Sequence, residues 1–211
     1  MRAVAVVSVL ALALAACGGD DDSSGPSGGG QKSLTVYSSL PLQGAQRPQT
    51  TDMVKGIQLA LEQAGNKAGG FQIKYESLDD STAQAGSWTP EATTSNARKA
   101  VQDDSTAIYI GEFNSGASAL SIPVLNEAGV PQISPANTAV GLTSDEPGAA
   151  PGEPDKYYPA GRRNYLRIVP KDTIQGAALV TLMKQDGCAR TFVLNDKEVF
   201  GAGLALSLIH I

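Results

Sequence analysis

The sequence contains few of the residues on which several classes of protein depend. Among its 211 residues are two cysteines, one histidine and one tryptophan, and only 5% are aromatic. Two cysteines cannot build a disulfide framework or a four-cysteine zinc site. Sixteen lysines and arginines stand against 21 acidic residues, which gives a net charge of −5. Because nucleic acid binding needs a basic surface, nucleic acid is not an expected partner.

What the sequence does contain is the composition of an ordinary α/β protein. Hydrophobic residues make up 42% of the chain and charged residues 18%. A chain of this length can bury one large core or two small ones.

The first residues are predicted to be a targeting segment and not part of the fold. Arg2 precedes an apolar run over residues 3–16, which is too short to span a bilayer but matches a signal-peptide core. The run ends in LAAC, which resembles the bacterial lipobox. We therefore expect residues 1–16 to be a lipoprotein signal peptide and Cys17 to carry lipid. The alternative is an ordinary signal peptide whose cleavage site happens to contain this cysteine.

Residues 17–33 contain the polar run GGDDDSSGPSGGG, which predicts a flexible tether. Acyl chains on Cys17 would tie the mature chain to the outer face of the cytoplasmic membrane. Only Cys188 then remains, so no intrachain disulfide can form, and we expect this residue to pack at the start of a strand.

From Leu34 onward, short β-rich runs alternate with helical patterns. Thr89 and Pro90 provide a cap and a first residue for a helix, and Gly129 ends a later one that contains Pro123, where we expect a kink or a restart. The expected strands are residues 34–39, 71–76, 107–111, 130–134, 165–169 and 191–196. The expected helices are residues 51–64, capped by Thr51 or Asp52, then 90–102, 115–128, and 172–185, capped by Asp172 or Thr173.

This alternation predicts an α/β fold with a parallel, doubly wound sheet. No expected strands are joined by a two-residue turn, and parallel neighbours need crossover connections, so helices should cover both faces. Ligands bind beyond the carboxyl ends of such strands. The loops at that edge are YSSLPLQG, GEFNSGAS and SPANTA, after the first, third and fourth strands.

Residues 143–163 form a connection rich in proline and glycine. It contains large side chains that can pack against the rest of the protein, namely Tyr157, Tyr158, Arg162 and Arg163. This predicts an ordered surface loop or flap. The alternative is a disordered insertion in its first half.

Enzymatic interpretations fail on specific residues. GEFNSGAS has the glycine spacing of a phosphate loop, but Ala117 and Ser118 stand where that motif needs lysine and then serine or threonine. There is no G-x-G-x-x-G after a strand and no G-x-S-x-G elbow. Asp79 and Asp80 are better explained as loop caps or solvated charges than as an acid/base pair, and the single histidine is His210, near the end. We predict no enzymatic activity, no cofactor and no metal site.

An ordered set of segments resembles one family. The signal, the tether, TVYSSLPLQG, VKGIQLALEQAG, GEFNSGASALSIPVLNEAGVPQISPANT and YLRIVPKD are similar to the leucine/isoleucine/valine-binding family of ABC-transporter substrate-binding proteins. The resemblance implies a type I periplasmic-binding-protein fold, with two α/β lobes that close on a small ligand. Residues 34–168 would form the first lobe, including the 143–163 loop, and residues 169–205 would begin the second.

The resemblance also assigns a ligand site. Ser115 matches a serine at a helix start that holds the ligand's carboxylate, and Ala136 and Thr138 match positions that grip its ammonium group. Ser39 and Asn114, in the neighbouring loops, complete the predicted set. A carboxylate at a helix N-terminus meets free N–H groups and the positive end of the helix dipole, which independently favours this arrangement. The alternative is that Ser115 caps its helix and Thr138 starts a turn.

Some residues depart from the family pattern. Asn114 stands where some relatives have a bridged cysteine, and Gln49 lies near an aromatic position of amino-acid binders. The expected ligand is therefore an amino acid, an amide or a related small polar solute, with branched-chain amino acids as one candidate.

The implied function is that of an extracytoplasmic solute-binding lipoprotein of an ABC importer. Its expected partners are the small-molecule solute, an ABC permease with ATPase subunits, and the membrane through the lipid on Cys17. The protein itself is expected to be a monomer. The alternative on the same fold is a ligand-sensing or regulatory lipoprotein without a transport role.

The ending, GAGLALSLIHI, does not match the family pattern. There the helix that begins with FGAG continues into a second lobe, for which too few residues remain. LSLIHI, residues 206–211, is also the translation of CTG TCT CTT ATA CAC ATC, which resembles a transposon end used in sequencing. We therefore expect a C-terminally truncated fragment, in which residues 206–211 are translated adapter. The alternative is a genuine short protein with an apolar tail.

Overall fold

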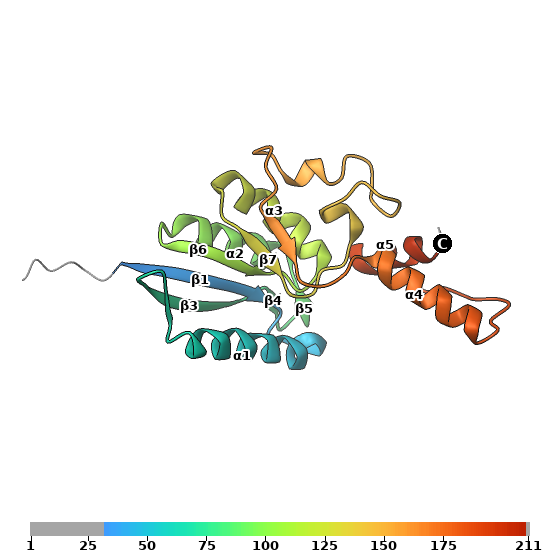
Figure 1. The fold of residues 1–211 in the computed structure, drawn as a ribbon, viewed down its shortest axis with the longest axis horizontal. Coiled ribbons are helices and arrows are strands. Elements are labelled where there is room, and N and C mark those ends of the chain that lie inside the picture. Colours follow the sequence, from blue (N-terminus) through green and yellow to red (C-terminus); the bar gives the residue numbers. More distant parts are fainter. Residues whose placement is uncertain (1–31, 210–211) are drawn as a thin grey trace, which may run out of the picture. The chain divides into compact units, whose positions relative to one another are not determined.

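Strands and helices alternate through the computed structural model, which describes residues 32–209 (Figure 1). The expected signal peptide, Cys17, nearly all of the tether, and His210 lie outside the described residues. The main sheet has the order β2-β3-β1-β6-β7-β8. Its strands are β1 (Ser33–Leu40), β2 (Lys67–Ala68), β3 (Phe71–Asp79), β6 (Thr106–Gly111), β7 (Gln132–Ser134) and β8 (Tyr165–Arg167).

Helices cover both faces of this sheet. Helix α1 lies against one face, and α2 and α3 lie against the other (Figure 1). The helices are α1 (Arg47–Gln63), α2 (Pro90–Gln102), α3 (Ser115–Ala128), α4 (Asp172–Gln185) and α5 (Val199–Ile209). Short 3₁₀ turns occupy Gly44–Gln46, Val140–Leu142 and Asp155–Tyr157.

The main sheet is parallel, as the fold class predicts, except for its short edge strand β2, which makes it mixed. Strand β1 pairs in parallel with β3 and β6, and β7 pairs in parallel with β6 and β8. Strand β2, however, pairs antiparallel with β3 through a two-residue turn at Gly69 and Gly70. Both glycines have positive φ, +55° and +84°, which such a tight turn requires and glycine adopts at little cost. A second hairpin joins β4 (Ser81–Thr82) to β5 (Ser87–Trp88).

Local signals place two helices where the sequence predicts them. Helix α2 begins after Thr89, whose Oγ1 accepts a hydrogen bond from the amide of Ala92 at 3.3 Å. Helix α3 ends at Gly129, which has φ +74°, and is continuous through Pro123, so the helix does not restart there. Helix α1 instead begins at Arg47, with Pro48 in its first turn, so Thr51 and Asp52 lie inside the helix and do not cap it.

Two clusters of buried side chains lie on the α2 and α3 side. One contains Tyr37, Ala97, Ala100, Tyr109 and Leu125, and joins the sheet to both helices. The other contains Ile122, Ala139, Leu142, Tyr157, Tyr158 and Tyr165. The loop of residues 143–163 thus contributes Tyr157 and Tyr158 to a core, and the hydroxyl of Tyr158 donates to the carbonyl of Leu142 at 2.6 Å.

On the opposite face, α1 leaves an apolar groove beside the strands. The groove has a volume of about 480 Å³ and is lined mainly by aliphatic side chains, among them Met53, Ile57, Ile108, Ile110, Ile133 and Ile168. Ile168, just after β8, is 75% exposed. This face therefore presents apolar surface to solvent in the described part of the chain.

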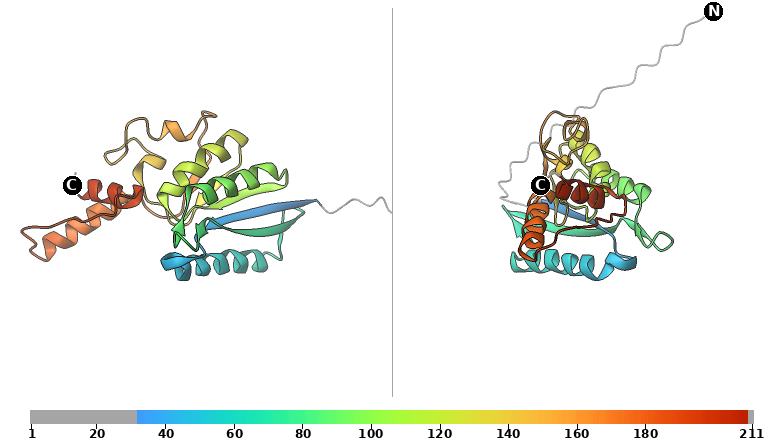
Figure 2. Two further views of the ribbon diagram at one scale, coloured as in Figure 1. Left: turned by 180° about the vertical axis from the view of Figure 1, so that it is seen from behind. Right: turned by 90° about the vertical axis from the view of Figure 1, so that its right-hand side faces the viewer.

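After β8, the chain forms α4 and α5, which pack against each other (Figure 2). Residues 191–196, predicted to be a strand, have no regular structure, and Phe192 and Leu194 are 85% and 83% exposed. A strand needs a partner for its backbone groups, and no strand within residues 32–209 pairs with this segment. The expectation that Cys188 packs in the interior is also wrong, because its thiol is free and exposed.

Candidate functional site

The loops after β6 and β7 meet at the carboxyl edge of the sheet and are joined by side-chain hydrogen bonds. The hydroxyl of Ser134 donates to the carbonyl of Glu112 at 2.7 Å and accepts from the amides of Ala136 and Asn137 at 3.2 and 2.9 Å. The side-chain amide of Asn137 donates to the carbonyl of Phe113 at 2.8 Å. These hydrogen bonds hold together the two loops that carry most of the predicted ligand residues.

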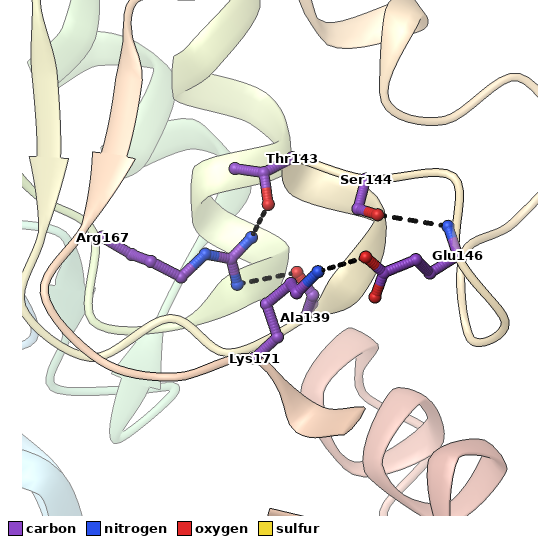
Figure 3. A network of polar contacts seen from close by, with 6 residues as sticks. All are labelled: Ala139, Thr143, Ser144, Glu146, Arg167 and Lys171. Carbon is purple, nitrogen blue, oxygen red and sulfur yellow. Dashed lines mark hydrogen bonds and ion pairs between the residues drawn. The ribbon is translucent and has the colours of Figure 1, made fainter. Parts of the chain in front are cut away.

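An arginine from β8 fixes the second of these loops. Nη1 of Arg167 donates to the carbonyl of Ala139 at 2.9 Å, and Nη2 donates to Oγ1 of Thr143 at 2.6 Å (Figure 3). Nearby, Nζ of Lys171 contacts Oε1 of Glu146 at 2.6 Å, and this ion pair holds the pKa of Glu146 below its usual value. The loop that contains Thr138 thus has cationic donors along one side.

Ser115 is the first residue of α3 and is only 2% exposed. Its hydroxyl accepts a hydrogen bond from the amide of Ala139 at a long 3.4 Å. Asn114 occupies the N-cap position, but its side chain makes no capping hydrogen bond. The first turn of α3 therefore starts without a side-chain cap from Asn114, beside the loop that contains Thr138.

Several buried acceptors around this point have no hydrogen-bond partner. They are Oδ1 of Asn114, Oγ1 of Thr138 and both carboxylate oxygens of Asp172. The amide of Asp172 donates to the carbonyl of Thr138 at 2.9 Å, which places the start of α4 against this loop. Burial raises the pKa of Asp172, while the hydroxyl of Thr138 and the guanidinium of Arg167 act to lower it. An unsatisfied buried polar group costs about 1–3 kcal/mol, so this corner is complementary to a molecule that donates hydrogen bonds.

The structure brings four of the five predicted residues to this corner. Asn114 and Ser115 come from the β6–α3 loop and the start of α3, and Ala136 and Thr138 from the loop after β7. Ser39 does not join them, because it lies inside β1, is fully buried, and accepts a hydrogen bond from the side chain of Asn96 at 3.1 Å. It is a core residue of the sheet in this structure.

Sequence reasoning gave two acidic residues the wrong environment or role. Asp172 was predicted only as a possible helix cap, yet Lys171 is the N-cap of α4 and Asp172 has unpaired oxygens at the corner. Asp80 was interpreted as a loop cap or a solvated charge, yet it is fully buried. Asp79 does act as a loop cap, since its carboxylate accepts from the amides of Leu42 and Ser81 at 2.9 and 2.8 Å.

Two side chains lie over the first turn of α3. A methyl group added at Gly116 would lie 2.9 Å from the ring of Trp88 in β5 and 3.5 Å from Val199 in α5. A methyl group added at Gly203, farther along α5, would lie 3.3 Å from Oδ2 of Asp172. Helix α5 therefore packs next to the start of α3 and next to Asp172.

Within residues 32–209, no group of three or more histidine, cysteine, aspartate or glutamate side chains is placed to hold a metal ion. None of the helices in that range has both the length and the apolar character to cross a membrane.

The chain thus combines a mostly parallel α/β sheet, helices on both faces, and a polar corner at the carboxyl edge of its strands, which is the edge where α/β folds place their ligand sites. The family model for periplasmic binding proteins matches residues 38–208, and the chain belongs to that family. The chain thus has the predicted type I periplasmic-binding fold. Comparison with curated proteins finds no significant match.

Solved structures of the same fold are close in shape and distant in sequence. The leucine-binding protein LivK from Thermotoga maritima is 24% identical with a TM-score of 0.68, and the alignment covers 84% of this chain and 45% of that one. LivJ from Streptococcus pneumoniae, in complex with isoleucine, is 22% identical with a TM-score of 0.67 and coverages of 85% and 46%. A solute-binding protein from Rhodopseudomonas palustris, in complex with 4-hydroxybenzoate, is 14% identical with a TM-score of 0.69 and coverages of 85% and 43%. This chain spans less than half the length of these structures.

Proposed function

We propose that the chain provides one wall of a solute-binding site for an amino acid or a related small zwitterion. The carboxylate of the solute lies at the N-terminus of α3 beside Ser115, and its ammonium group lies against Asn114, Thr138 and Asp172. The observation that supports this most directly is the set of buried acceptors without partners. A primary ammonium group offers three N–H donors, which complements these acceptors.

The chemistry of the corner favours an amino acid over a simple acid. The solved relatives include complexes with isoleucine and with 4-hydroxybenzoate, and both of these ligands carry a carboxylate. The N-terminus of α3 offers either one a favourable position, worth about 0.3–2 kcal/mol. Of these two ligands, only the amino acid carries an ammonium group that can also donate to Oδ1 of Asn114 and to the carboxylate of Asp172.

We further propose that this wall belongs to a lipoprotein that serves an ABC importer. The lipid on Cys17 would hold the protein on the outer face of the cytoplasmic membrane. Residues 17–33 would act as a flexible tether that lets the lobe contact its permease. The protein would act as a monomer and perform no chemistry of its own, passing the solute to the permease and its ATPase subunits.

Titration by nuclear magnetic resonance tests the site. The alignment covers only 45% of the leucine-binding relative, so we expect weak binding of L-leucine by this chain, on the order of millimolar, equivalent to about −4 kcal/mol. Ser115→Ala removes one hydrogen bond to a charged group, worth about 1.5–3 kcal/mol, which should weaken binding by more than tenfold.

The matched control is Ser144→Ala, whose hydroxyl accepts only from the exposed amide of Glu146. This variant should bind as the unmodified chain does. Equal binding by the Ser115→Ala variant and the unmodified chain would remove Ser115 from the site.

A further inference from the structure

Two carboxyl groups meet in the interior behind the candidate site. Asp80 follows β3 and Glu112 follows β6, and these strands flank β1 on either side. Both residues are fully buried. Oε1 of Glu112 accepts a hydrogen bond from the hydroxyl of Tyr109 at 2.9 Å, whereas Oε2 of Glu112 and both carboxylate oxygens of Asp80 have no donor. The two side chains nevertheless lie within hydrogen-bonding reach of each other.

Among residues 32–209, no positively charged group is found to act on the pair. Asp79, at the end of β3, is negative and acts to raise the pKa of Asp80. Ser39 of β1 and Tyr109 of β6 face the pair as neutral groups. In α2, the side-chain amide of Asn96 donates hydrogen bonds to the hydroxyl of Ser39 and to the carbonyl of Asp79. From α3, the hydroxyl of Ser118 accepts a hydrogen bond from the amide of Glu112 at 3.1 Å.

Two ionised carboxylates cannot face each other in such a place. Neither carboxylate could donate to the other, and both charges would be buried without a counter-ion. A single proton removes both problems, because one carboxyl becomes a donor and the pair carries one charge. Burial raises the pKa of Asp80 to about 6, with a hydrogen bond from Glu112 acting to lower it and the charge of Asp79 acting to raise it. Burial, followed by the neighbouring Asp80, raises the pKa of Glu112 well above its usual value. The two groups titrate as a coupled pair.

The main chain of Glu112 links this pair to the candidate site. Its amide donates to the hydroxyl of Ser118 in α3 at 3.1 Å. Its carbonyl accepts from Ser134, whose hydroxyl in turn holds the amides of Ala136 and Asn137. Asn114 and Ser115 follow Glu112 in the chain after one residue. Any displacement of Glu112 therefore moves both loops of the candidate site.

We propose that Asp80 and Glu112 hold one shared proton, and that this proton positions the two loops of the solute site. The second half of the proposal rests on the proposed function, and the first half does not. Loss of the proton places two like charges side by side in the interior and pushes Glu112 away from Asp80. Both residues are positioning residues, since neither contacts the corner where the solute is proposed to bind.

The direction of the pH dependence follows from the raised proton affinity of the folded pair. In the unfolded chain these carboxyls titrate near pH 4, so above that value the folded state holds a proton that the unfolded state has lost. The equilibrium constant for unfolding then rises with pH, up to tenfold per pH unit for one proton. This rise begins near pH 4 and continues through the folded pKa of the pair, which for Asp80 is about 6.

Chemical denaturation of the purified full chain between pH 4 and 9 is the test, with Glu112→Gln and Asp80→Asn beside the unmodified protein. The amide in either variant donates to the remaining carboxylate without a titrating proton, so both should lack this component of the pH dependence. Glu127→Gln, at an exposed carboxyl of α3, is the matched control and should keep it. The proposal is overturned if the unmodified chain matches both variants, or if calcium or sodium stabilises it at high pH in place of the proton.

The link to the site is read from amide resonances of Ser115, Ala136 and Asn137. These should titrate together in the unmodified chain and in Glu127→Gln, and stay constant in Glu112→Gln. Resonances that titrate unchanged in Glu112→Gln refute the positioning role. If the pH dependence is found but L-leucine binds at no pH, the shared proton stands and the proposed function fails. If L-leucine binds but the pH dependence is absent, the proposed function stands and the shared proton fails.

Discussion

Replacing Arg167 by methionine should lower the free energy of unfolding by about 2–4 kcal/mol. The guanidinium donates to the carbonyl of Ala139 and to Oγ1 of Thr143 at 2.9 and 2.6 Å (Figure 3). A longer contact of 3.3 Å joins it to the carbonyl of Asn137. Two good hydrogen bonds from a charged donor are worth about 1.5–3 kcal/mol each. Burial lowers the pKa of Arg167, which shows that its charge carries a desolvation cost. Methionine removes that cost together with the charge, and this gain offsets part of the loss.

Urea denaturation at pH 7 measures this change as a shift in midpoint at constant slope. Arg167→Lys should recover only part of the loss, because a point donor cannot reach both acceptors as the planar guanidinium does. The control is Arg98→Met, at an exposed position of α2, which should change stability by less than about 0.5 kcal/mol. A loss below about 0.5 kcal/mol in Arg167→Met would refute the view that Arg167 fixes the loop of Thr138.

Two smaller predictions concern other parts of the chain. Thr89→Ala removes the side-chain cap of α2, which should cost about 0.5–2 kcal/mol in the same denaturation assay, with Thr89→Ser close to the unmodified chain; equal stability of the alanine variant would contradict the capping role. Cys188 is free and exposed, so a thiol reagent should label the native chain as fast as the unfolded one, and slow labelling would show that the thiol is covered.

Elements with strong local signals could be predicted from the sequence. The pair Thr89 and Pro90 determines where α2 begins, and Gly129 determines where α3 ends, because caps act through atoms only a few residues apart. The hairpin of β2 and β3 was missed, although the two glycines at its turn are a known hairpin signal. Strand β2 spans only Lys67–Ala68, and two residues give no alternating pattern to detect.

The predicted strand over residues 191–196 shows the limit of local reasoning. Its pattern of apolar residues is suitable for a strand, but backbone hydrogen bonds must come from a neighbouring strand, and none in the described range pairs with it. Its large apolar side chains, Phe192 and Leu194, are therefore exposed.

For the candidate site, topology was predictable and side-chain direction was not. Asn114, Ser115, Ala136 and Thr138 follow strands that end at one edge of the sheet, so their proximity follows from strand order. Ser39 ends the expected strand of residues 34–39 and was predicted to face the ligand, but β1 continues to Leu40 and buries it. Asp79 and Asp80 are adjacent in sequence, yet one caps a loop and the other is buried, because successive side chains at a strand end point in opposite directions.

The central claim is that the corner formed by Asn114, Ser115, Thr138 and Asp172 binds an ammonium group together with a carboxylate. It is tested most directly by titrating the chain with L-leucine and, separately, with 4-methylpentanoate, which is the same molecule without its ammonium group. The amide resonances of these four residues should shift with L-leucine and much less with 4-methylpentanoate. Equal shifts with both compounds, or shifts confined to other residues, would contradict the claim.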